Sequence, residues 1–349
     1  MRVIDCAGPG ITRRRAGNGF TYQDQDGNRV DDPAVVDRIR ALAVPPAWTD
    51  VWICPDPRGH IQATGTDARG RRQYRYHDEW RERKDREKYD RMLDMARALP
   101  RLRERLARDL AGDGLGRDRV LACAVRLLEL GLFRVGGESY VEDNGSYGLA
   151  TVRKGHVRAV GGQLRFDYPA KGGQRRVVEI RDPEVIDVVR ALKRRRRGGP
   201  ELLAYKDEGG RWHDVRSSDI NAYLQEVLGS DFSAKDFRTW AATVLAAVAL
   251  AAEEAEVDGE LSDTRRRRAV VRVVKGVASQ LGNTPAVARG SYVDPRVIEE
   301  FNRGETVGED LAESIDDDTA LDGVDPDVLS EIEEEVVSLI ERGRRRRVR

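Results

Sequence analysis

The interpretation of this chain depends on a stretch from Ser233 to Pro295. It opens with SAKDFRTW (233–240), continues through an alanine-rich segment, and closes with GNTP (282–285) and GSYVDP (290–295). The alanine-rich segment predicts a long apolar helix. Packing alone does not explain Arg238 at its head, Asn283 in a later turn, or Tyr292 nine positions after that amide. These three side chains are therefore candidates for a functional site.

Charge is distributed unevenly along the 349 residues, although the formal net charge is zero. Residues 301–349 contain 15 acidic and 7 basic side chains, whereas residues 1–300 contain 54 basic and 46 acidic ones. A basic body with an acidic end indicates a polyanionic partner and a tail that competes with that partner or repels it. Composition alone also allows both regions to be ordinary solvated surface.

The cysteines and histidines argue against a disulfide framework and a structural zinc site. Three cysteines lie far apart at positions 6, 54 and 123, which favours a reducing compartment. The four histidines have no Cys or His partner at metal-ligand spacing. The longest apolar run, Trp240 to Ala252, is too short to span a bilayer, and no secretory signal is recognised. We therefore expect a cytoplasmic protein that binds no metal and no membrane.

The first ninety residues are predicted to form a small β-rich domain. Strands are expected at 51–53 and 60–63, and a short helix begins at Asp32-Pro33, where proline is tolerated. A charged helix from Asp78 to Leu99, interrupted by Pro100, is expected to link the two halves. The organisation that follows is a DNA-binding domain over 1–90, a catalytic domain over 91–302, and an acidic, then basic, tail over 303–349.

The segment 67–77 alternates arginines with tyrosines and a glutamine beside a flexible glycine. Arginines neutralise phosphates, glutamine can read base edges, and tyrosine hydroxyls can bind phosphate oxygens. A basic solvated strand is the alternative. The candidate DNA contacts are Arg71, Arg72, Gln73, Tyr74 and Tyr76.

Two further cations stand out upstream of the C-terminal motifs. Arg134 follows an amphipathic helix predicted over 117–131, in the segment LFRVGG (132–137), where two glycines would let an anion approach the backbone. Lys171 lies at the tip of a predicted hairpin within an antiparallel meander over 148–180. An arginine at a helix end and an exposed turn lysine are the structural alternatives.

Taken together, these motifs resemble the poxvirus-like type IB DNA topoisomerases, in particular the bacterial branch. The resemblance rests on FRVG (133–136), the hairpin Lys171, KDFRT (235–239), GNT (282–284) with Tyr292, and GRRQYRY (70–76). It covers roughly Val3 to Phe301 and excludes the acidic tail. The viral enzymes carry histidine where this chain has Asn283; an amide can still donate a hydrogen bond to a phosphoryl oxygen.

The resemblance implies an α+β clamp around duplex DNA and a 3′-phosphotyrosyl intermediate on Tyr292. Arg134, Arg238 and Asn283 would supply donors to the phosphoryl oxygens. Lys171 would act as general acid on the departing 5′ oxygen, and Lys235 would touch the DNA nearby. The resemblance implies relaxation by strand rotation and religation.

The chemistry of such a reaction needs neither a nucleotide nor a metal cofactor. Guanidiniums occupy the place of a cation, and the phosphotyrosine keeps the energy of the broken bond. A tyrosine is a poor nucleophile at its ordinary pKa of about 10, so the same cations must favour its phenolate. We expect a monomer without an obligate protein partner, acting at the nucleoid.

Two other functions fit parts of the pattern. A tyrosine recombinase shares the catalytic arrangement, but such enzymes usually carry His-x-x-Arg where this chain has Lys235-x-x-Arg238, and their N-terminal domain is helical. A DNA-packaging protein without chemistry would also have a basic body. For residues 301–335, the acidic composition suggests a tail that inhibits the enzyme or imitates DNA.

Overall fold

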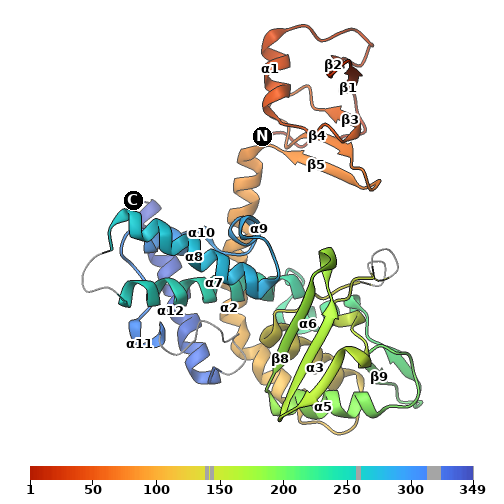
Figure 1. Ribbon diagram of the computed structural model, residues 1–349, viewed down its shortest axis with the longest axis vertical. Coiled ribbons are helices and arrows are strands. Elements are labelled where there is room, and N and C mark those ends of the chain that lie inside the picture. The colour runs from red at the N-terminus through yellow and green to blue at the C-terminus, as the bar shows by residue number, and fades with distance from the viewer. Residues whose placement is uncertain (138–140, 142–144, 257–260, 313–323, 349) are drawn as a thin grey trace. The chain divides into compact units, whose positions relative to one another are not determined.

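The computed structural model describes residues 1–137, 141, 145–256, 261–312 and 324–348 (Figure 1). Two compact units are present, residues 1–90 and residues 91–349. The expected α+β class is confirmed, because an antiparallel sheet comes first and a mainly helical region with small sheets follows. No described helix is both long and apolar enough to cross a bilayer.

The first unit is a five-stranded antiparallel sheet with one helix on it. The strand order is β2-β1-β3-β4-β5. The strands are β1 (Ile11–Ala16), β2 (Gly19–Gln23), β3 (Thr49–Ile53), β4 (Ile61–Thr66) and β5 (Arg72–Tyr76). Helix α1 (Pro33–Ala41) starts where expected, since the Asp32 side chain accepts a hydrogen bond from the Ala34 amide.

Alternation along β5 divides its side chains between the two faces of the sheet. The core of this unit is formed by Ile39 of α1 with Ile11, Ile53 and other apolar strand residues. Arg75 faces this side and donates to the carbonyl of Leu42 at the end of α1. Arg72, Tyr74 and Tyr76 are exposed on the opposite face. This face of β5 therefore presents an arginine and two tyrosine rings at the surface, with Arg72 donating to the hydroxyl of Thr64 at 2.9 Å.

The linking helix is longer than the sequence indicated. Helix α2 (Asp78–Leu110) runs through Pro100 instead of ending before it. Proline removes one backbone hydrogen bond, but Leu99, Leu102 and Leu106 are all buried in the second unit's core. Burial of this leucine stripe, at about 2 kcal/mol for each side chain, outweighs the lost bond.

The second unit is built around α7 (Ala234–Ala255), which is buried along most of its length. Its N-terminus is fixed by a capping box, since Asp236 accepts hydrogen bonds from the backbone and hydroxyl of Ser233. Figure 1 shows α7 and α8 lying side by side. The other helices are α3 (Arg117–Gly131), α5 (Pro183–Arg194), α6 (Ser217–Leu228), α8 (Asp263–Leu281), α9 (Pro285–Ser291), α10 (Pro295–Phe301), α11 (Glu309–Ala312) and α12 (Pro326–Val348).

A three-stranded antiparallel sheet follows α3 in the chain. Strands β6 (Val157–Val160), β7 (Gln163–Pro169) and β8 (Arg175–Ile180) pair in that order. The first strand of the expected meander, at 148–153, is wrong, because a 3-10 turn, η1 (Leu149–Thr151), occupies it. A separate small ribbon joins β9 (Ala204–Lys206) to β10 (Trp212–Asp214).

The last part of the C-terminal region over 303–349 is a long helix, α12. Helix α12 packs against α7 and α10 with five apolar side chains buried. Its Glu333 accepts hydrogen bonds from Arg103 of α2 and from the indole of Trp240 in α7. Apart from Glu333, the acidic side chains of α12 are exposed or half-buried, as in an amphipathic helix, which a count of charges cannot reveal. The acidic residues at 313–323 lie outside the described residues.

Candidate functional site

Four of the candidate residues meet where the ends of α3, α8 and α9 approach the first turns of α7. Arg134 donates hydrogen bonds through Nη2 to the side-chain oxygen of Asn283 and, at 2.7 Å, to the carbonyl of Gly282. The guanidinium carbon of Arg238 lies 5.4 Å from the centre of the Tyr292 ring. The fold therefore gathers residues that are up to 158 positions apart in the sequence.

Arg134 is held by the backbone that follows α3. The helix ends at Leu132, whose φ of 50° is left-handed, and the chain continues in an extended form. The carbonyl of Arg134 accepts from the Leu149 amide at 2.9 Å, and that of Val135 accepts from the Ala150 amide at 2.8 Å. These two hydrogen bonds from turn η1 hold the backbone of Arg134 and Val135 in place.

The glycines next to Arg134 have a different purpose from the one expected. A Cβ on Gly136 would lie 2.7 Å from the Cα of Gly148, and a Cβ on Gly148 would lie 2.4 Å from the Cα of Gly136. Gly136 therefore allows two backbone segments to touch, and the approach of an anion to its backbone stays a prediction.

Asn283 is placed by the C-terminal cap of α8. Gly282 adopts a left-handed conformation, with φ 60° and ψ 47°, and the amide of Asn283 returns to the carbonyl of Ala278 at 2.9 Å. The Asn283 Nδ2 is buried and has no hydrogen-bond partner within the described part of the chain. Since Oδ1 accepts from Arg134, the orientation of the amide is fixed and Nδ2 is its unpaired donor.

Arg238 is almost fully buried, with 2% of its surface exposed. It donates to the carbonyl of Leu132 at the end of α3 and, at 2.7 Å, to the carbonyl of Leu281 at the end of α8. Helix C-termini leave carbonyls without intrahelical partners and carry partial negative charge. These two carbonyls accordingly satisfy a cation that would be costly to bury alone.

Tyr292 is half-buried just after α9. Its amide donates to the carbonyl of Ala288 at 3.0 Å, and its own carbonyl accepts from the hydroxyl of Thr243 at 3.3 Å. Thr243 also accepts from the Asp294 amide at 3.1 Å. Because Thr243 lies on α7 five residues after Arg238, one helix positions both the arginine and the tyrosine backbone.

The surrounding charges change the acidity of the phenol. Burial raises the pKa of Tyr292, but the charge and hydrogen bond of Arg238, followed by the charges of Lys235 and Arg134, together hold it below its ordinary value of 10. Burial, and then repulsion from Arg134, lowers the pKa of Arg238 to about 10. At neutral pH, Arg238 therefore remains a cation beside a phenol that ionises more readily than usual.

The two candidate lysines lie on the exposed edge of the same unit. Lys235 is exposed in the first turn of α7, close enough for its charge to lower the pKa of Tyr292. Lys171 is exposed at the turn η3 (Lys171–Gly173), which joins β7 to β8 as expected. Gly172 and Gly173 both have positive φ there, so the turn conformation depends on glycine.

The candidate DNA contacts in the first unit separate into two groups. The rings of Tyr74 and Tyr76 are stacked with centroids 6.2 Å apart, and Arg72 shares their exposed face. By contrast, Arg71 and Gln73 both bind the carboxylate of Asp67. That carboxylate has a pKa well below its ordinary range, chiefly because Arg71 hydrogen-bonds to it.

Two residues of the site were missed by the sequence analysis. Thr243 carried no signal, because a threonine within an apolar helix commonly bonds its own backbone. Arg176 donates to the carbonyl of Gln280 at 2.7 Å and to that of Gly131 at 3.1 Å. Its signal was present: in the strand 175–180 it shares the face of Val178 and Ile180, which are buried.

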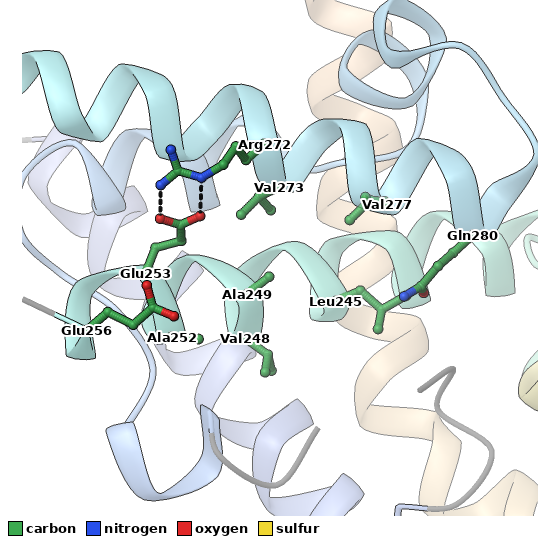
Figure 2. A pocket seen from close by; sticks show the side chains of 11 residues that line it. Leu245, Val248, Ala249, Ala252, Glu253, Glu256, Arg272, Val273, Val277 and Gln280 are labelled. Carbon is green, nitrogen blue, oxygen red and sulfur yellow. Dashed lines mark hydrogen bonds and ion pairs between the residues drawn. The ribbon is translucent and has the colours of Figure 1, made fainter. Parts of the chain in front are cut away.

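A hollow of about 550 Å³ lies elsewhere, between α7 and α8 (Figure 2). Small apolar side chains such as Ala249 and Val273 line it, and the Glu253 carboxylate holds the Arg272 guanidinium across one end. No candidate catalytic residue lines this hollow. Among the described residues, no three His, Cys, Asp or Glu side chains gather as metal ligands.

Comparison with known proteins gives two family matches and one curated relative. Residues 77–310 match the catalytic core of eukaryotic DNA topoisomerase I, and residues 19–67 match the N-terminal domain of bacterial DNA topoisomerase IB. The chain is 35% identical over 288 residues to the DNA topoisomerase 1B of Acanthamoeba polyphaga mimivirus, covering 81% of this chain and 85% of that protein.

Proposed function

This chain belongs to the type IB DNA topoisomerase family, and we propose that it relaxes supercoiled duplex DNA by breaking and rejoining one strand at a time. Tyr292 attacks a backbone phosphate and becomes joined to the 3′ side of the nick. The free 5′ end then turns about the intact strand, and its hydroxyl attacks the phosphotyrosine to restore the DNA. The observation that carries the proposal is the contact of Tyr292 with the buried guanidinium of Arg238.

We assign the stabilisation of the transition state to Arg134, Arg238 and Asn283. Attack on a phosphodiester concentrates negative charge on the two non-bridging oxygens, and fixed donors at that point usually provide the largest single contribution to the rate. Support comes from the link between Arg134 and Asn283 and from the unpartnered Nδ2 of the amide. The hydrogen bond between Arg134 and Asn283 fixes these two groups relative to each other before the substrate arrives.

We assign the general acid to Lys171. The 5′ oxygen leaves as an alkoxide unless a proton reaches it, and an ammonium on a long side chain is suited to deliver that proton. The assignment is supported by the exposed position of Lys171 at a hairpin tip in the same unit as the other four residues. Since all five come from one chain, a monomer is sufficient for the reaction.

We propose that duplex DNA is also held by the exposed face of β5. Arg72 would neutralise a phosphate, while Tyr74 and Tyr76 would contact the backbone or bases beside it. Arg71 and Gln73 would have to exchange Asp67 for DNA, so their contribution is smaller. Lys235 would bind a phosphate next to the one attacked by Tyr292.

The reaction would require neither ATP nor a divalent metal. The energy of the broken phosphodiester is kept in the phosphotyrosyl bond, and guanidiniums neutralise the charge for which other enzymes use a cation. A tyrosine recombinase would use similar groups, but the family match over 77–310 and the β-rich first unit favour a topoisomerase.

The test is relaxation of supercoiled plasmid in EDTA without ATP, comparing the unmodified chain with Tyr292→Phe. We expect the unmodified chain to relax both signs of supercoil and to become covalently attached to DNA, while Tyr292→Phe binds DNA but does neither. Relaxation by Tyr292→Phe at the unmodified rate would reject Tyr292 as nucleophile. An inactive unmodified chain would reject the proposed function.

A further inference from the structure

Two arginines connect the ends of α3 and α8 in the same way. The carbonyls that one arginine binds are adjacent in sequence to those bound by the other. Arg238 donates to the carbonyls of Leu132 and Leu281, as described above. Arg176 donates to the carbonyls of Gly131 and Gln280, which immediately precede them. The ends of α3 and α8 are therefore held together by two successive guanidinium bridges. Only the first of these comes from a residue that the motifs single out.

Arg176 differs from Arg238 in the element that carries it. It lies in β8 opposite Tyr168 of β7, and the two side chains are hydrogen-bonded. Tyr168 is buried, with its ring stacked 6.1 Å from that of Phe133. Phe133 immediately precedes Arg134. The base of the hairpin is therefore connected to the chain around Arg134 by the stacked rings of Tyr168 and Phe133 and by the guanidinium of Arg176, which binds the Gly131 carbonyl.

The position of Gly282 brings this bridge next to the phosphoryl-binding candidates. A Cβ on Gly282 would lie 3.4 Å from Nη1 of Arg176 and 3.7 Å from Nη1 of Arg134. The cap that orients Asn283 thus borders both guanidiniums. A planar guanidinium can span two carbonyls, whereas a lysine ammonium cannot reproduce that fork.

We propose that Arg176 is a positioning residue that fastens the hairpin carrying Lys171 to the helix ends carrying Arg134 and Asn283. This inference rests on the proposed function, because it concerns where the general acid stands relative to the phosphoryl-binding groups. Lys171 begins the turn η3, two residues beyond Pro169, which pairs with Arg175 at the end of the ladder. The paired strands that Arg176 holds therefore set where the turn carrying Lys171 stands.

The inference predicts a defect that resembles loss of the general acid. In Arg176→Met, the hairpin base is no longer held, and displacement of an acid by about 1 Å can slow a reaction by on the order of 100-fold. We expect single-turnover cleavage to fall by about that factor, with DNA affinity within about threefold of the unmodified chain. The cleavage rate of Arg176→Lys, which keeps one donor group, should lie between those of Arg176→Met and the unmodified chain.

The matched control is Arg165→Met on the same hairpin. Arg165 lies on the exposed face of β7 and forms an ion pair with Glu179 on the neighbouring strand. Its replacement removes the same charge from the same sheet without touching the bridge between α3 and α8. We expect cleavage within about threefold of the unmodified rate.

A second substrate distinguishes positioning of Lys171 from general damage to the fold. When sulfur replaces the bridging 5′ oxygen, the leaving thiolate needs no proton, because thiols are much more acidic than alcohols. We therefore expect Arg176→Met to cleave the sulfur substrate within about tenfold of the unmodified chain. Equal slowing on both substrates would overturn the inference, as would unimpaired cleavage of the ordinary substrate.

Folding of each variant is checked by thermal melting. If Arg176→Met does not fold, the same two substrates are compared with Arg176→Lys, for which we expect a loss on the ordinary substrate smaller than on the order of 100-fold and the same overturning results. The unmodified chain is measured in parallel on ordinary DNA. Its failure to cleave would reject the proposed function, whereas its activity combined with normal cleavage by the Arg176 variants would reject only this inference.

Discussion

Asn283→Ala tests the electrostatic part of the proposed mechanism most directly. The Asn283 amide is oriented by Arg134, which donates to Oδ1, and its Nδ2 is buried without a partner in the described part of the chain. The substitution removes this donor and leaves the backbone cap at Gly282 unchanged, since that cap uses main-chain groups alone. The fold should therefore survive while one phosphoryl contact is lost.

The expected size of the effect follows from the loss of one preorganised donor. Removal of such a group costs about 100- to 1,000-fold in the chemical step, or about 2.7–4 kcal/mol of transition-state stabilisation. Because Arg134 also loses the acceptor that orients it, we expect the upper part of this range. Asn283→His should recover part of the rate, since an imidazole N–H can also donate.

The assay is single-turnover cleavage of duplex DNA with enzyme in excess, measured together with the dissociation constant. The control is Asn302→Ala, which removes an exposed amide at the end of α10. Cleavage by Asn283→Ala within about threefold of the unmodified rate would refute the reasoning. A loss that appears mainly in the dissociation constant would also refute it, because the donor would then bind the ground state as strongly as the transition state.

Three further predictions concern the acid, the nucleophile and the C-terminal helix. Lys171→Ala should slow strand cleavage far more than it weakens DNA binding, and equal losses in a cleavage assay and a binding titration would reject a general-acid role. The pKa of Tyr292 lies below 10, so the cleavage rate should rise with pH and level off below pH 10. Lys235→Met removes one cation that favours the phenolate, so the pH at which the rate levels off should increase. An unchanged pH profile in this variant would contradict the role of Lys235. Glu333→Ala removes the buried acceptor of Arg103 and Trp240 and should lower the free energy of unfolding by about 3 kcal/mol. This is the lower end of the cost of breaking a buried ion pair, because Glu129 still pairs with Arg103. Urea unfolding measures this loss, and no loss would show that α12 adds little to the second unit.

The role of the C-terminal region changes with the structure. The hypothesis of an inhibitory or DNA-imitating tail treated residues 301–335 as one acidic segment. Helix α12 is instead part of the second unit's core, with Ile332 and Val336 fully buried. Its removal would therefore affect stability before it affected regulation, and a truncation experiment should be interpreted in that order.

Local sequence was sufficient for most helix starts and for the order of the motifs. Asp32-Pro33 begins a helix as expected, and Asp182-Pro183 and the Ser233–Asp236 box begin helices by the same local capping, because a cap needs only neighbouring residues. The helix end expected at Pro100 was wrong because that prediction also used only neighbouring residues. The local cost of the proline was visible in the sequence, while the burial that offsets it belongs to the tertiary fold.

The α+β class, the family and the residues that carry its motifs could all be predicted from local sequence patterns. How those residues are supported depends on contacts that form only in the folded chain. The bridges made by Arg238 and Arg176 satisfy carbonyls at the ends of α3 and α8, and these acceptors come from segments between 43 and 106 positions away. Periodicity and capping act over a few residues, whereas a helix end takes its last hydrogen-bond partners from whichever distant segment the core brings beside it.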